Sequence, residues 1–171
     1  MEAMISHRPR RPRWTHWGLG ALSGLALAGA AQARLGETRA ECAQRYGTAG
    51  EPTRSMVPGS EPEALRFVRK QLEITAHFKN GVAWHMTYAR AYLSDNEKAA
   101  VLEENSGDLE WQPRLGEKVG NIRLWRCPAL DYAASAIEGP GLMLIEIMTR
   151  ACAQEIASQR ELRLATVGEK R

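Results

Sequence analysis

The chain has 171 residues, a length that suits one domain. Its composition, 44% hydrophobic and 25% charged, excludes collagen-like, strongly disordered and disulfide-dominated classes of protein. The formal net charge of +3 comes from the N-terminus, because residues 1–33 carry four arginines and one glutamate, whereas residues 34–171 carry 19 basic and 19 acidic side chains. Since residues 34–171 have no excess of basic side chains, nucleic acid is not expected as a partner.

The first 33 residues have the three parts of a secretory signal peptide. A basic segment containing RPRRPR precedes an apolar stretch over residues 18–30 and then an Ala-Gln-Ala site at 31–33. Cleavage between Ala33 and Arg34 would leave 138 residues. The apolar stretch is too short for a spanning helix, so no membrane span is expected after cleavage. We therefore expect an exported protein, periplasmic or secreted, with the general and twin-arginine routes both open.

Residues 34–171 contain three cysteines, Cys42, Cys127 and Cys152. Export makes a disulfide possible, and three thiols allow one bridge in any of three pairings. Cys127 with Cys152 is the favoured pairing, because both lie beside predicted elements in the C-terminal half. Three buried free thiols are the alternative. No Cys-x-x-Cys pair is present, so the sequence indicates neither a redox pair nor a thiolate zinc site.

The first predicted element is a short helix between Thr38 and Gly47. Thr38 and Glu41 have the spacing of a capping box, and a glycine at the helix end suits a left-handed backbone. Residues 48–64 are rich in proline, glycine and serine and are predicted to form a loop. Residues 65–68 are compatible with a strand that precedes the main hairpin.

The clearest strand signal is a pair of alternating apolar sets. They are Leu72, Ile74, Ala76 and Phe78, followed by Val82, Trp84, Met86 and Tyr88. A two-residue Asn80-Gly81 turn would place the two sets on opposite faces of the hairpin. A three-residue turn over 79–81 would pair Phe78 with Val82 and put all eight side chains on one buried face. We therefore predict the three-residue turn, with Gly81 in the left-handed position.

The remaining segments complete an α+β pattern. Ser94 and Glu97 form a second capping box for a helix that ends near Gly107. Residues 108–115 and 121–126 are predicted short strands, 132–137 and 142–148 a second hairpin, and 150–164 a helix. This order predicts an antiparallel sheet built from hairpins and packed with two or three helices. It forms a single domain over residues 34–165, followed by a loose tail over 166–171.

Two histidines are the candidate chemical groups of residues 34–171. His77 and His85 fall diagonally on the hairpin face opposite the apolar sets. They could form two ligands of a metal site or act as base for a nucleophile, although solvated polar residues on an outer face give the same pattern. No Gly-x-Ser-x-Gly elbow is present, and no two carboxylates are brought to a catalytic separation. Neither a catalytic residue nor a cofactor is therefore predicted.

Trp111 and Trp125 are the candidate binding residues. Each is a single tryptophan on a short predicted strand, where an indole is either half-buried core or an anchor for a partner.

The first helix and the hairpin also carry a resemblance. The stretch RLGETRAECAQRYG, followed by a loop and FKNGVAWHMTY, resembles small exported bacterial proteins of uncharacterised function. It is also similar to the helix-plus-sheet modules of β-lactamase-inhibitor proteins and of the small outer-membrane assembly lipoprotein, through Gly36, Thr38, Tyr46, Gly47 and Gly81. The resemblance implies binding to another protein and no active site.

The leading hypothesis is a non-catalytic periplasmic or secreted module that binds another envelope or secreted protein, with Trp111 and Trp125 as anchors. The alternative is a small envelope hydrolase or metal-dependent enzyme that uses His77 or His85. The first predicts a flat apolar or aromatic patch, and the second predicts a concave pocket that joins a histidine to a carboxylate.

Overall fold

The computed structural model describes the backbone of residues 34–114 and 121–168, with side chains up to residue 162. The predicted signal peptide, which ends at Ala33, lies outside the described residues. Among the helices of the described part, none combines the length and the apolar character that a membrane span requires.

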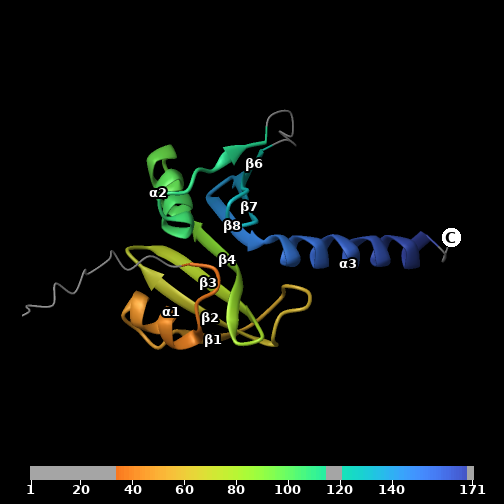
Figure 1. Ribbon diagram of the computed structural model, residues 1–171, viewed down its shortest axis with the longest axis horizontal. Helices are drawn as coiled ribbons and strands as arrows, with labels where there is room; N and C mark the ends of the chain where they lie inside the picture. The colour runs from red at the N-terminus through yellow and green to blue at the C-terminus, as the bar shows by residue number, and fades with distance from the viewer. Residues whose placement is uncertain (1–33, 115–120, 169–171) are drawn as a thin grey trace, which may run out of the picture.

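One antiparallel sheet carries the fold (Figure 1), in the strand order β1-β2-β3-β4-β8-β7-β6-β5. The described strands are β1 (Glu51–Arg54), β2 (Glu63–Arg69), β3 (Leu72–Lys79), β4 (Val82–Arg90), β5 (Gln112–Pro113), β6 (Ile122–Cys127), β7 (Tyr132–Gly139) and β8 (Leu142–Thr149). The described helices are α1 (Arg39–Tyr46), α2 (Asp95–Ser106) and α3 (Arg150–Gly168). The predicted α+β class is confirmed, and α3 runs past residue 164, where the sequence predicts its end.

The sheet consists of two halves with the same order of elements. In each half a helix precedes four consecutive strands, α1 before β1–β4 and α2 before β5–β8. The last strands of the two halves, β4 and β8, pair antiparallel at the centre of the sheet. Both helices begin with the predicted capping box, on Thr38 and on Ser94. The similarity lies in the topology, since the sequence shows no internal repeat.

Helices α1 and α2 cover one face of the sheet, which we call the core face. The core contains side chains from both helices and from both halves of the sheet, among them Cys42, Phe67, Phe78, Met86, Tyr88, Leu102 and Ile145. Burying a large apolar side chain contributes about 1.5–3 kcal/mol. This face therefore supplies most of the stabilisation. The opposite, outer face carries α3, which continues from β8 and runs away from the sheet (Figure 1).

The turn of the β3–β4 hairpin differs from the prediction. Lys79 pairs with Val82, so the turn contains only Asn80 and Gly81. Both turn residues have left-handed backbone angles, with φ of 53° and 80°. This conformation matches the twist of the strands and favours an Asn-Gly sequence. The predicted three-residue turn is therefore wrong.

A β-bulge in β4 places apolar side chains of both strands on one buried face, which the longer turn was expected to do. Phe78 pairs with Ala83 and His77 with His85, so Trp84 is the extra residue. Beyond the bulge the alternation of β4 is shifted by one residue, which returns the following apolar side chains to the core face. Trp84 itself is buried, but on the outer face beside Lys79, whose ammonium lies 4.1 Å from the centre of the indole ring.

Two further expectations are corrected. Residues 48–64 are not all loop, because β1 and the first residues of β2 lie among them. The expected disulfide is not formed, because Cys42, Cys127 and Cys152 are free and buried. Cys127 belongs to the core-face side of β6, whereas Lys79 and Glu146 of the outer face are among the charges nearest to Cys152. The sheet therefore separates the two thiols of the favoured pairing.

Candidate binding site

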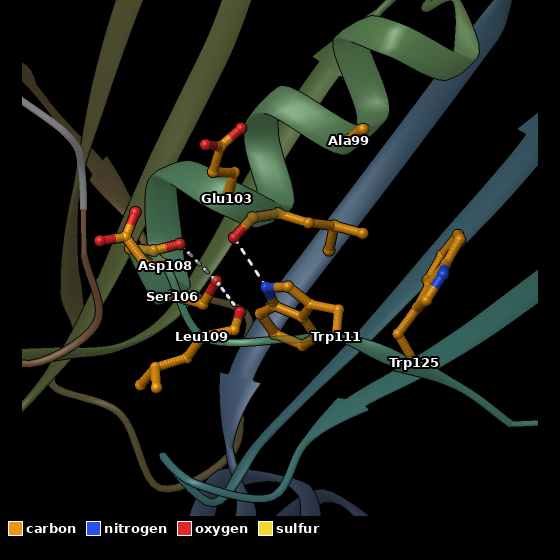
Figure 2. Close-up of a pocket in the computed structure, with 9 residues that line it drawn as sticks. Ala99, Glu103, Ser106, Asp108, Leu109, Trp111 and Trp125 are labelled. Atoms are coloured by element: carbon orange, nitrogen blue, oxygen red, sulfur yellow. Dashed lines mark hydrogen bonds between the residues drawn. The ribbon is translucent and has the colours of Figure 1, made fainter.

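Trp111 and Trp125 line one cavity of about 510 Å³ beside the C-terminal end of α2. Figure 2 shows Trp111 beneath the last turn of the helix and Trp125 to one side of it. The remaining lining residues come from α2 and the segment that follows it, namely Ala99, Leu102, Glu103, Ser106, Gly107, Asp108 and Leu109. We call this cavity the aromatic pocket. It brings together the two residues that the sequence names as candidate anchors.

The end of α2 fixes the position of Trp111. Gly107 has a φ of 64° and donates its N–H to the carbonyl of Glu103 at 2.8 Å, which ends the helix. The Ser106 hydroxyl donates to the carbonyl of Leu109 at 2.8 Å and holds the turn that follows (Figure 2). The indole N–H of Trp111 then donates to the carbonyl of Leu102 at 2.8 Å. Because the last carbonyls of a helix lack partners within it, this bond both completes the helix end and orients the indole.

Trp125 enters the pocket from the sheet. It pairs with Pro113 on β5 and with Ala134 on β7, and its half-buried ring packs against the edge of the core. Its indole N–H donates to no other residue in the described part of the chain. A tryptophan with an apolar ring and an unused donor is suited to contact a second molecule.

The rim of the aromatic pocket is acidic. Glu103 and Asp108 line it, and residues 103–110 contain four acidic side chains and no basic one. Neither Glu103 nor Asp108 forms an ion pair with another described residue. Arg34, the first residue after the predicted cleavage site, lies close by, since one of its nitrogens is 3.5 Å from where a Cβ on Gly107 would lie.

A second cavity, of about 410 Å³, adjoins the aromatic pocket at Trp125. Its lining includes Arg114, Arg126 and Arg150, and we call it the arginine pocket. Arg150 lies 3.4 Å from a carboxylate oxygen of Asp131. Trp125 therefore lines both a cavity with an acidic rim and a predominantly basic one.

The two histidines face each other directly across β3 and β4, not diagonally as predicted. Their ring centres are 5.1 Å apart, and both rings lie on the outer face. Nδ1 of His77 is 2.8 Å from the hydroxyl of Ser55, and Nε2 of His85 is 3.8 Å from a carboxylate oxygen of Glu146. The bulge at Trp84 explains the changed alignment, because it shifts β4 by one residue relative to β3.

Both histidine rings are sealed from solvent. His77 is 7% exposed and His85 2% exposed. The loop that follows β1 covers them, and its Ser60 hydroxyl accepts a hydrogen bond from Trp84 at 2.8 Å. Burial lowers the pKa of His77 to about 4 and that of His85 to about 3. The nearby carboxylate of Glu146 favours a charged His85, but the loss of hydration outweighs it, and both rings are neutral near pH 7.

The geometry offers these histidines a structural role. Neither ring lines the cavities described above, and the described residues contain no group of three His, Cys, Asp or Glu side chains placed to hold a metal ion. The thiol of Cys152 is buried on the same face, and burial raises its pKa to about 12. Burial likewise raises the pKa of Cys42 to about 11. Both thiols are therefore protonated and weakly nucleophilic.

No protein-family model, curated protein or solved structure matches the chain. The resemblances drawn from the sequence therefore stay predictions. The two indoles were predicted from the sequence, but the acidic rim and the arginine pocket were not. The run of acidic residues over 103–110, which ends next to Trp111, was the signal that could have found the rim.

Proposed function

We propose that the chain is an exported, non-catalytic module that binds another envelope or secreted protein through the aromatic pocket. The observation that carries this proposal is the meeting of Trp111 and Trp125, from two different elements, in one solvent-accessible cavity. A side chain of the partner would enter between the indoles. The unused N–H of Trp125 would donate to an acceptor on the partner.

Tryptophan in a cavity is a typical anchor of a protein interface. A few side chains usually supply most of the binding energy, and tryptophan is among the most frequent of them. A stable complex buries roughly 1,200–2,000 Å² in total, which is more than the pocket alone offers. The adjoining arginine pocket and the acidic rim therefore belong to the same proposed interface.

The charges favour a partner segment of a particular kind. The acidic rim, with Glu103 and Asp108, complements a basic residue beside the inserted apolar side chain. Arg126 and Arg150, in the arginine pocket, complement an acidic one. A partner that carries an apolar anchor, a cation beside it and an anion elsewhere on its surface would suit these regions.

A crosslinking pull-down from the envelope fraction of the source organism tests the proposal. The intact protein should capture one saturable partner, and Trp125→Ala should abolish the capture. Asp108→Lys should weaken it by at least tenfold in a subsequent binding titration, because the charge on the rim is reversed. Tyr92→Ala is the matched control, since Tyr92 is an aromatic residue with 68% of its surface exposed that does not line the pocket.

Trp111→Phe separates binding from folding. It keeps an aromatic ring but removes the hydrogen bond to Leu102, so its circular dichroism spectrum and unfolding curve accompany the binding data. A partner that binds wild type and Trp125→Ala equally would contradict the proposed interface. Absence of any saturable partner would count against a binding module and direct work to metal analysis and hydrolase screens with His77 and His85 variants.

A further inference from the structure

A third cavity, of about 270 Å³, lies on the helix-covered side of the sheet, away from both tryptophans. It opens between α2 and the turn that joins β2 to β3. Five of its lining residues are apolar: Leu72 and Ile74 from β3, Leu93 from the segment before α2, and Ala100 and Val101 from α2. We call this cavity the Tyr46 cleft, after the α1 residue that completes its wall.

Charged groups surround the mouth of the Tyr46 cleft, and cations are in excess. Arg69, Lys70 and Arg90 line it together with Glu97 and Glu104. Arg90 is bound to Glu97 at 2.9 Å. Arg69 and Lys70 are exposed, and neither forms an ion pair within 4 Å in the described part of the chain. The charge of Arg69 acts on the carboxyl group of Glu104 from beyond ion-pair distance, so an anion at the mouth would meet two cations that are not held in an ion pair.

The turn that presents these cations has an unfavourable backbone. Arg69 pairs with Leu72, so Lys70 and Gln71 form a two-residue turn, and their φ angles are 49° and 67°. Left-handed angles at two successive residues favour Asn-Gly, which this chain uses in the β3–β4 turn. Side chains with a Cβ are strained there, and such strain is concentrated at binding sites. The strained turn thus places a lysine at the mouth of a cavity.

The wall of the Tyr46 cleft contains a buried hydroxyl group, that of Tyr46. It interacts with the hydroxyl of Tyr88. The ring of Tyr46 is held against Phe67, with 4.6 Å between ring centres. Burial raises the pKa of Tyr46, so the hydroxyl stays protonated and can donate.

We propose that the Tyr46 cleft binds a small amphipathic carboxylate, with its apolar part on Leu72, Leu93 and Val101 and its carboxylate at Arg69 and Lys70. The size of the cavity limits the ligand. A cavity of about 270 Å³ suits a short ligand. An unbranched six-carbon acid has the right size and polarity.

Three probes of equal length test the charge preference: hexanoate, 1-hexanol and hexylamine. Each is titrated into the intact ¹⁵N-labelled protein, and amide chemical shifts are followed. Hexanoate should shift the amide signals of residues 69–74 and 97–104 in a saturable manner. Its Kd should be at least tenfold lower than the Kd of either other probe. Equal affinity for hexylamine, equal affinity for 1-hexanol, or shifts confined to another region would overturn the proposal.

Lys70→Asn is the decisive variant, because asparagine tolerates the left-handed backbone and removes only the charge. Unfolding should require more urea than in wild type, whereas the Kd for hexanoate should rise at least fivefold. Gln71→Gly relieves the same turn without changing charge and should keep wild-type affinity. Arg54→Glu, an exposed charge reversal on β1, is the control for overall electrostatics. Retained hexanoate affinity in Lys70→Asn would refute the role assigned to this cation.

Discussion

Lowering the pH from 8 to 5.5 should destabilise the protein through His77 and His85. Burial lowers their pKa to about 4 and about 3 in the folded chain, whereas an unfolded chain titrates near 6.5. Between these values the unfolded chain binds protons that the folded chain does not. The free energy of unfolding therefore rises with pH in this window and falls on acidification.

The size of this fall in unfolding free energy depends mainly on the pKa of a histidine in the unfolded chain. At pH 5.5 each buried neutral histidine costs about 1.4 kcal/mol relative to pH 8, so the pair costs about 3 kcal/mol. This is a large share of the 5–15 kcal/mol or so that stabilises a typical domain. The carboxylates of Glu61, Asp95 and Glu138 have pKa values below their ordinary range, and their contribution is lost only nearer pH 4 and below. Destabilisation by acid above pH 5.5 therefore comes from the histidines, whereas Glu104, whose pKa is raised by burial, acts in the opposite direction.

Urea unfolding at pH 8, 7, 6 and 5.5, followed by circular dichroism, measures the effect. His77→Gln keeps an acceptor for Ser55, and His85→Leu fills a site whose ring Nδ1 has no hydrogen-bond partner. Each variant should lose about half of the pH dependence, and the double variant nearly all of it. Unfolding free energies that agree at pH 8 and 5.5 in wild type would refute the reasoning. A double variant with undiminished pH dependence would refute the assignment to this pair.

Two further substitutions probe the packing. Gly59→Ala should cost about 1–2 kcal/mol in urea unfolding, because Gly59 has a φ of 75° and a Cβ there would lie 3.2 Å from the ring of Trp84. Gly141 also has a left-handed backbone, but there is open space around it. Gly141→Ala should therefore lose only the part of the stability that the backbone strain costs. Lys98→Ala should cost about 1–2 kcal/mol, because the buried lysine bonds Glu138 at 2.7 Å and joins α2 to β7. Glu138→Gln, which keeps a neutral acceptor, should lower the free energy of unfolding by less than Lys98→Ala does. Equal losses within either pair would contradict the explanation.

The local signals in the sequence predicted the helix ends well. The capping boxes at Thr38 and Ser94 and the glycines at 47 and 107 are all found where expected. Such signals depend on residues three or four positions apart, which the sequence contains directly. The α+β class of the fold was predicted from these helix-end signals, together with the alternation of apolar and polar residues in the two hairpins.

The candidate site was less predictable, because it depends on contacts between distant segments. The sequence named Trp111 and Trp125 separately, but only the pairing of β5 with β6 places them in one cavity. The arginine pocket needs β6, β7 and α3 together. The diagonal placement of the histidines was wrong for a different reason: an alternation argument assumes a regular ladder, and the single extra residue at Trp84 changes every pair beyond it.

The length of the β3–β4 turn can be tested by substituting Asn80. In the structure both Asn80 and Gly81 are left-handed, whereas the three-residue turn expected from alternation needs only Gly81 to be so. Asn80→Ala should therefore cost about 1 kcal/mol, because alanine has no local hydrogen bond to offset the left-handed backbone. Asn80→Gly should match wild type closely. Urea unfolding of the two variants measures the difference. An alanine variant as stable as wild type would favour the three-residue turn, and with it a hairpin in which Trp84 faces the core and the two histidines are again diagonal.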